Sequence, residues 1–138
     1  MNDKTQISAP MVDISTIATA PRIVEILHPV TEQPVGVLVT LLPQDDPRVR
    51  AERNRIQDVM LVLRQKGKQI TQAQIERNTI NLLKASIESW DWSQSTIAFN
   101  GGRPEFTPQN VEAVLTQVTW FRDQIDEELG DEKAFFPK

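Results

Sequence analysis

The chain has 138 residues, enough for one domain with a buried core, and it contains no cysteine and a single histidine. The lack of thiols excludes disulfides, thiolate metal sites and cysteine nucleophiles, and one histidine cannot form a histidine-rich metal cluster within one chain. A net charge of −4 and a pI near 5.0 argue against general nucleic-acid binding, and no apolar run approaches the roughly 18 residues that a membrane span needs.

Residues 1–20 combine polar and small side chains with a proline, a composition that predicts a flexible N-terminal arm. A frayed terminus is the simpler interpretation, and a binding arm is the alternative. The first residues lack the long apolar core of a secretory signal, so we expect a cytoplasmic protein that does not enter a membrane.

A β-hairpin is predicted over about residues 22–42. Two stretches rich in β-branched side chains, 22–27 and 35–41, are separated by the turn-forming segment 29–34, which has a proline at each end. Both stretches are apolar on more than one face. Because a two-stranded ribbon is marginally stable by itself, we expect it to pack on helices or on another subunit.

The next segment predicts a helix over about residues 47–66. Asp46 suits the N-cap, and Pro47 suits the first helical turn, where its missing N–H costs nothing. Gly67 is expected to end the helix, and its outer face is basic. The apolar side chains that recur at helical spacing on the other face are Val49, Ile56, Val59, Met60 and Leu63.

A second helix is predicted over about residues 71–90, where Thr71 and Gln74 form a capping-box pattern. Its apolar stripe consists of Ile75, Thr79, Leu82, Leu83, Ile87 and Trp90. Trp90 and Trp120, at helical spacing beside aliphatic residues, are interpreted as core, whereas Trp92 is left equally open between core and surface.

Residues 91–106 are expected to form a loop that contains a short candidate strand at 96–99. Thr107 suits an N-cap and Pro108 the first helical position, and together they predict a final helix over about 108–129. A continuous apolar stripe runs along this helix, and a glycine follows it.

The C-terminal tail is expected to cover residues 131–138. It carries Phe135 and Phe136, which would be a liability at a terminus unless a partner covered them. The predicted fold class is therefore α+β and mostly α: one domain over 21–130, with an N-terminal hairpin and three main helices.

No set of side chains predicts catalysis. His28 precedes a proline without a serine or an acid placed to form a triad, so a turn histidine is favoured over a general base. Asp45 and Asp46, with Asp58 further on, resemble helix-start chemistry more than a metal site. Segment 100–103 is a plain turn, because the ordered phosphate-binding fingerprints are missing. We expect no enzyme activity, no cofactor and no metal.

The charge distribution suggests contact between copies. Segment 45–68 holds seven basic and four acidic residues, a net of +3, and segment 122–138 holds six acidic and three basic residues, a net of −3. Two solvated helix faces are the simple interpretation. The alternative is a head-to-tail contact in a homo-oligomer, in which the basic helix of one subunit meets the acidic end of the next.

Two stretches resemble a known family. The first consists of segment 26–36 (ILHPVTEQPVG) and segment 45–50 (DDPRVR), in which a hairpin turn with an acid, threonine, proline and glycine is followed by a strand and an acid-started, arginine-bearing helix. The second consists of segment 87–90 (IESW), segment 106–111 (FTPQNV) and Leu115, a helix-ending tryptophan followed by a loop and a new helix start.

Their order and spacing resemble the tail assembly chaperones of long-tailed, lambda-like bacteriophages, over roughly residues 22–128. His28 stands where an aspartate is commoner in that family, and Gln33 stands where a glycine is expected. The resemblance implies a mostly helical α+β domain that is non-catalytic. It would bind and solubilise the tape measure protein during tail morphogenesis in the host cytoplasm, and it would be absent from the mature virion. In many relatives a translational frameshift adds an extension that recruits the tail tube protein.

A holding chaperone needs apolar surface that is hidden when it is alone and useful with a partner. The candidate partner-binding residues are Trp92, Phe135, Phe136, Val35, Val37, Arg48 and Arg55. The alternative function is a small structural tail or neck component of the virion. A bacterial secretion-type chaperone is a weaker variant of the binding class. An enzyme would need a clustered set of polar residues in a cleft, and the single histidine and the absence of cysteine disfavour it.

Overall fold

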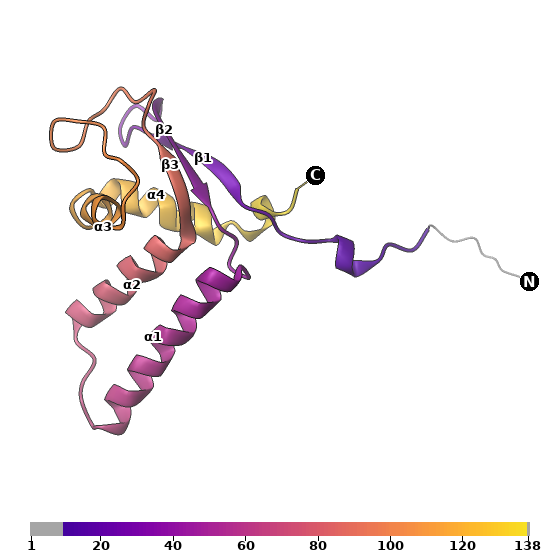
Figure 1. Cartoon of the computed structure of the whole chain (residues 1–138), viewed down its shortest axis with the longest axis vertical. Helices are drawn as coiled ribbons and strands as arrows, with labels where there is room; N and C mark the ends of the chain where they lie inside the picture. Colours follow the sequence, from indigo (N-terminus) through magenta and orange to yellow (C-terminus); the bar gives the residue numbers. More distant parts are fainter. Residues whose placement is uncertain (1–9, 138) are drawn as a thin grey trace, which may run out of the picture.

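The structure, a computed structural model, describes residues 10–137, so residues 1–9 of the predicted arm and Lys138 lie outside the described residues. The fold is α+β, with an N-terminal β-hairpin, a third strand and four helices in the described part of the chain (Figure 1). The elements are η1 (Ile14–Thr16), β1 (Arg22–Leu27), β2 (Pro34–Leu41), α1 (Pro47–Gln65), α2 (Gln72–Ser86), β3 (Ile87–Asp91), α3 (Pro108–Gln117), α4 (Thr119–Gly130) and η2 (Glu132–Phe135).

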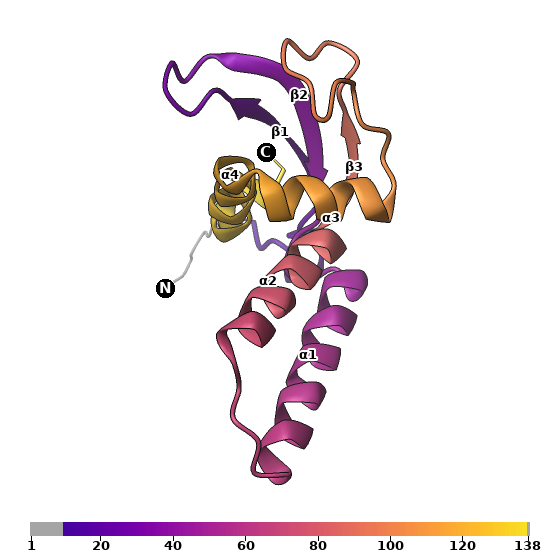
Figure 2. The same cartoon turned by 90° about the vertical axis from the view of Figure 1, so that its left-hand side faces the viewer.

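The sheet is antiparallel throughout, in the order β1-β2-β3. The predicted hairpin is confirmed: Val24 pairs with Val39, which in turn pairs with Trp90 on β3. Side chains alternate along β2, so that one face of the sheet is buried against α3 and α4 while the other faces outward. The core lies between that inner face and the two C-terminal helices (Figure 2).

The predicted helix over 71–90 is too long. The helix ends at Ser86, and Ile87–Asp91 instead pairs with β2 as strand β3. Ile87 and Trp90 are both buried, at a three-residue spacing that is typical of a helix. In β3 they pair with Leu41 and Val39 across a shift of register, which brings both side chains to the buried face. Pairing decides between helix and strand, because without β3 the central strand β2 would present a row of unpaired backbone N–H and C=O groups.

The predicted helix over 108–129 is interrupted. Val118, with φ −110 and ψ 84, separates α3 from α4, and Figure 2 shows the two helices running in different directions. The bend lets Leu115 of α3 and Phe121 and Ile125 of α4 enter the same core. The candidate strand at 96–99 is also wrong, because only an isolated bridge between Phe99 and Gly102 forms there.

Helices α1 and α2 form a helical hairpin that projects away from the sheet and α3–α4 (Figures 1 and 2). The predicted start of α1 is confirmed, because the Asp46 carboxylate accepts a hydrogen bond from the Arg48 N–H at 2.8 Å. Gly67, at φ +68, follows the end of the helix. The side chain of Thr71 caps α2 as predicted, accepting from the Gln74 N–H.

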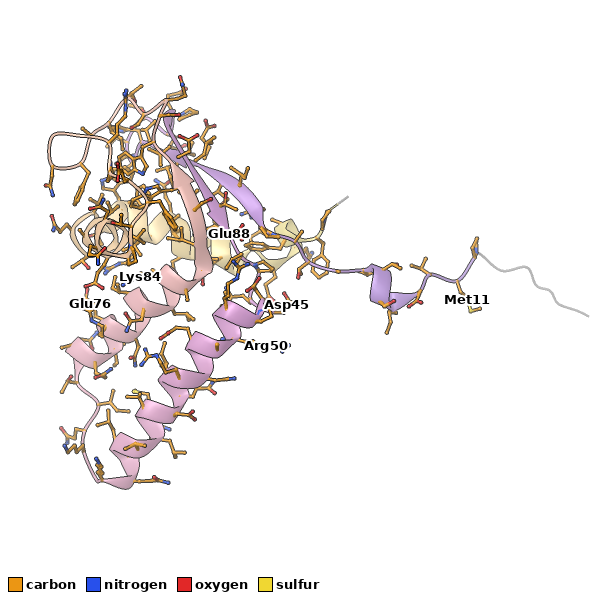
Figure 3. The ribbon with its side chains drawn as sticks, in the orientation of Figure 1. Met11, Asp45, Arg50, Glu76, Lys84 and Glu88 are labelled. Carbon is orange, nitrogen blue, oxygen red and sulfur yellow. The ribbon has the colours of Figure 1, made fainter. Side chains whose placement is uncertain are left out.

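Residues 10–21 form an arm that leaves the body (Figure 1), and Met11 lies near its far end (Figure 3). The arm is anchored at its base, where the Thr19 hydroxyl donates to Asp45 at 2.7 Å and the Ala20 N–H donates to the Phe135 carbonyl at 2.9 Å. Its large apolar side chains are exposed: Met11, Val12, Ile14 and Ile17. The flexibility of this arm stays a prediction.

Candidate partner-binding surface

Trp92 lies in the core, which decides the question that the sequence leaves open. Only 5% of its surface is exposed, and its ring stacks on Phe121 with centroids 6.0 Å apart and an interplanar angle of 13°. Trp90 meets it edge-on at 5.7 Å and donates its indole N–H to the Pro104 carbonyl. The prediction that Trp92 contacts a partner is therefore wrong, because in this fold its apolar ring is covered by the chain itself.

The loop after Trp92 is fixed on β2. The Thr96 N–H donates to the Val35 carbonyl at 2.8 Å. At Gly36, whose φ is +80, an added Cβ would lie 2.1 Å from the backbone oxygen of Gln94. Only glycine permits this close approach and this backbone conformation together. The loop therefore closes over the end of the core next to Trp92.

Three further candidate residues are also buried. Val35 and Val37 belong to the inner face of β2, and Phe135 packs into the core with the Arg22 guanidinium 5.2 Å from its ring centroid. These residues offer no surface to a partner in this structure. The β1–β2 hairpin is apolar on its inner face because that face packs on α3 and α4. The predicted C-terminal tail is partly folded onto the body through η2. Phe136 remains 44% exposed.

Both candidate arginines lie at the surface of α1. Arg48 pairs with Asp46 and with Glu88, each at 3.1 Å, and so ties the start of α1 to β3; Figure 3 shows Glu88 at this end of the helix. The hydrogen bond from Arg48 lowers the pKa of the Asp46 carboxyl and, reciprocally, Asp46 raises the pKa of Arg48. Arg55 pairs with Glu52 one turn before it.

An uncovered flank of α1 is the surface that the sequence analysis missed. Four residues at successive spacings of four, three and four lie on one side of the helix: Arg55, Val59, Val62 and Lys66. Both valines are exposed, and the exposed fraction of Val62 is 45%. We call these four residues the α1 flank. They form a narrow apolar strip between two cations.

The sequence carried a partial signal for this surface. Helical spacing places Val59 on the predicted apolar face, but α1 buries only Val49 among its own residues. Ile56, Met60 and Leu63 are partly covered, and Met60 accepts a hydrogen bond from Asn78 of α2. Periodicity identified an apolar helix, but it could not tell that α1 would meet only one neighbouring helix along most of its length.

The polar residues considered for catalysis, metal binding or phosphate binding make structural contacts within turns and helix caps. The Nδ1 atom of His28 accepts hydrogen bonds from the backbone N–H groups of Val30 and Thr31, at 3.1 and 3.2 Å, inside the β1–β2 turn. Asp46 is a helix cap, in agreement with its predicted role. Segment 100–103 forms the predicted turn between Phe99 and Gly102. Among residues 10–137, no group of three histidine, cysteine or acidic side chains could hold a metal ion.

No helix in the described part of the chain is both long enough and apolar enough to cross a membrane. The chain matches no protein-family model, and comparison with curated proteins and with solved structures finds no similar protein.

Proposed function

We propose that this chain is a non-catalytic binding protein, a phage tail assembly chaperone that holds the tape measure protein through the α1 flank. The observation that carries the proposal is the projecting α1–α2 hairpin, on which Val59 and Val62 stay exposed between Arg55 and Lys66. These two neighbouring aliphatic side chains are not covered by the rest of the described chain, so they are suited to contact with a partner.

The chemistry of the strip defines the kind of client. A long amphipathic helix could lay its apolar seam along α1, and acidic residues beside that seam would meet Arg55 and Lys66. The tape measure protein, which the family resemblance names as the client, would be such a long helical chain. Because Arg55 is already held by Glu52, its side chain is partly ordered before binding, which lowers the entropic cost of the contact.

Co-purification with the tape measure protein from the same genome tests this proposal. Val59→Ser combined with Val62→Ser should abolish co-purification and leave the helical circular dichroism signal unchanged, because both side chains are exposed. Leu61→Ser is the matched control, since Leu61 is 51% exposed on the other side of the same helix and should leave co-purification intact.

Full co-purification by the double serine variant would contradict the assignment of the α1 flank. The place of the protein in the infected cell needs a separate measurement. A chaperone acts in the host cytoplasm and should be absent from purified particles. Stoichiometric recovery of the chain from mature virions would instead support a structural tail or neck component.

A further inference from the structure

The outer face of the sheet carries aliphatic side chains that the rest of the described chain leaves uncovered. Ile23 and Leu27 of β1 and Leu38 of β2 are exposed, because α3 and α4 pack on the opposite face. The exposed fraction of Ile23 is 65%. Cross-strand pairing places Leu38 between Glu25 on β1 and Asp91 on β3. We call Ile23, Leu27 and Leu38 the outer sheet patch.

The N-terminal arm carries a second set of uncovered apolar side chains. Four of the eight residues of segment 10–17 are large, apolar and exposed: Met11, Val12, Ile14 and Ile17. Removing such side chains from water is favourable by roughly 25 cal/mol for each Å² of apolar surface that is buried. The arm is therefore suited to pack on an apolar surface that lies within its reach.

The anchors at the base of the arm determine which surface it can reach. The bonds from Thr19 to Asp45 and from Ala20 to Phe135 hold the residues immediately before β1. Among the described residues, those before Thr19 are hydrogen-bonded only to one another, around η1. Figure 1 shows the arm and α3 on opposite sides of the sheet. The arm therefore leaves the body on the side of the outer sheet patch.

The arm and the outer sheet patch match in spacing. Ile17 lies three residues before Ala20, and Ile23 lies three residues after it. Ile14 lies six residues before Ala20, and the β1 residue that pairs with Leu38 lies five residues after it. With the shorter rise of the η1 turn, the two longer paths each span about 16 Å. An arm that turned back at residues 18–20 would therefore lay its isoleucines over the patch.

We infer that the arm closes over the outer sheet patch of its own chain, with Ile17 beside Ile23 and Ile14 beside Leu38. The two anchors stay in place while segment 10–18 turns as a strap, so the extended arm of Figure 1 and the closed arm are two states of one chain. Closure removes apolar side chains of both surfaces from water, and it does not depend on concentration. It does not rest on the proposed function, because it does not involve the α1 flank.

Disulfide trapping in the full chain tests the inference, because the chain contains no cysteine of its own. Ile14→Cys with Leu38→Cys should form a disulfide within one chain at least about tenfold faster than Ile14→Cys with Arg50→Cys, because a disulfide requires close and oriented Cβ atoms. Arg50 is the matched control. It is exposed on α1 and lines the same pocket as Thr19, so it is near the base of the arm but away from the sheet (Figure 3).

The trapped products give a clear result in either direction. Equal rates for the two cysteine pairs would overturn the inference. A disulfide that forms mainly between two chains would overturn it as well, and non-reducing electrophoresis separates that product by its doubled mass.

NMR of the parent chain measures the contact without added cysteines. NOEs should join the arm isoleucines, Ile14 and Ile17, to the methyl groups of the outer sheet patch, and their intensities should not change on dilution. Asp13 in the arm and the two carboxylates beside Leu38 repel one another, so added salt should preserve or strengthen these NOEs. Their absence would contradict closure of the arm.

Two double serine variants separate this contact from the proposed function. Ile14→Ser with Ile17→Ser should shift the methyl resonances of Leu38. Val59→Ser with Val62→Ser, on the α1 flank, should leave those resonances unchanged. All four substituted side chains are exposed, so both variants should keep the circular dichroism of the parent chain. An unchanged Leu38 resonance in the arm variant would overturn the inference, whereas the α1 flank variant tests client binding alone.

Discussion

The body of the molecule and the α1–α2 hairpin are stabilised in different ways. In the body, the inner face of the sheet and helices α3 and α4 enclose side chains such as Val37, Leu115 and Ile125, none of which reaches solvent. Helix α1, by contrast, buries only Val49 and is supported by its cap and by one neighbouring helix. A segment with little buried apolar surface has a low local stability and keeps its side chains available. The body therefore maintains the fold, whereas α1 leaves most of its side chains at the surface.

The largest expected effect is at Trp92 in the body. Trp92→Ala should lower the free energy of unfolding by about 3–5 kcal/mol, because it leaves a cavity beside Phe121 and Trp90. Val62→Ala on the hairpin should change it by less than about 0.5 kcal/mol. Urea denaturation of both variants measures the difference, and similar losses in the two would remove the distinction between the regions.

Gly36 is the next most sensitive position. Gly36→Ala should destabilise the protein by about 2 kcal/mol, because the new Cβ would meet the Gln94 carbonyl and the backbone is in a left-handed conformation. Gly130→Ala is the control, since nothing lies within 4 Å of a Cβ added at the last residue of α4. It should be neutral or slightly stabilising. Thermal unfolding of the two variants tests the close approach between β2 and the loop.

A smaller effect is expected in the β1–β2 turn. His28→Ala removes the acceptor for the Val30 and Thr31 N–H groups and should cost about 1 kcal/mol. His28→Asp provides a carboxylate that can accept in the same kind of turn, and should retain most of the stability. Amide hydrogen exchange at Val30 and Thr31 reports the change directly, and unchanged protection in the alanine variant would contradict the role of the imidazole.

The smallest expected effect is on the stability of helix α1 at acid pH. The hydrogen bond from Arg48 holds the pKa of Asp46 below its ordinary value of 3.8. Because the folded pKa is depressed, this stabilisation is present above that ordinary value and is lost as the pH falls through the folded pKa. Asp46→Asn keeps a good N-cap without the charge, so its α-helical signal should depend less on pH below about 4. Acid titrations by circular dichroism compare the two chains, and parallel curves would contradict the prediction.

Local signals predicted much of the chain. Asp46, Thr71 and Thr107 were identified as helix caps from their neighbours in the sequence, and each accepts the expected backbone hydrogen bond. The β-hairpin was likewise visible from its β-branched strands and its proline-bordered turn. These features depend on contacts between residues a few positions apart, so the sequence around each of them contains the necessary information.

The candidate surface was harder to predict. Val35, Trp92 and Phe135 are apolar residues beside turns or the terminus, and from sequence such residues are equally suited to a core and to an interface. Their burial depends on α3 and α4 closing over the sheet. The α1 flank, conversely, has the periodicity of a core helix. It is exposed because no second helix packs against α1 along this side in the described structure.

The sequence by itself determined where α1, α2 and α3 begin, where the first hairpin turns and that cysteine chemistry is excluded. Tertiary structure alone decided that segment 87–91 is a strand, that the last helix bends at Val118 and which apolar side chains remain outside. The physical reason is the separation along the chain of the residues that must interact. Caps and turns satisfy backbone groups locally, whereas strand pairing and burial depend on residues that are distant in the chain and are brought together only when it folds.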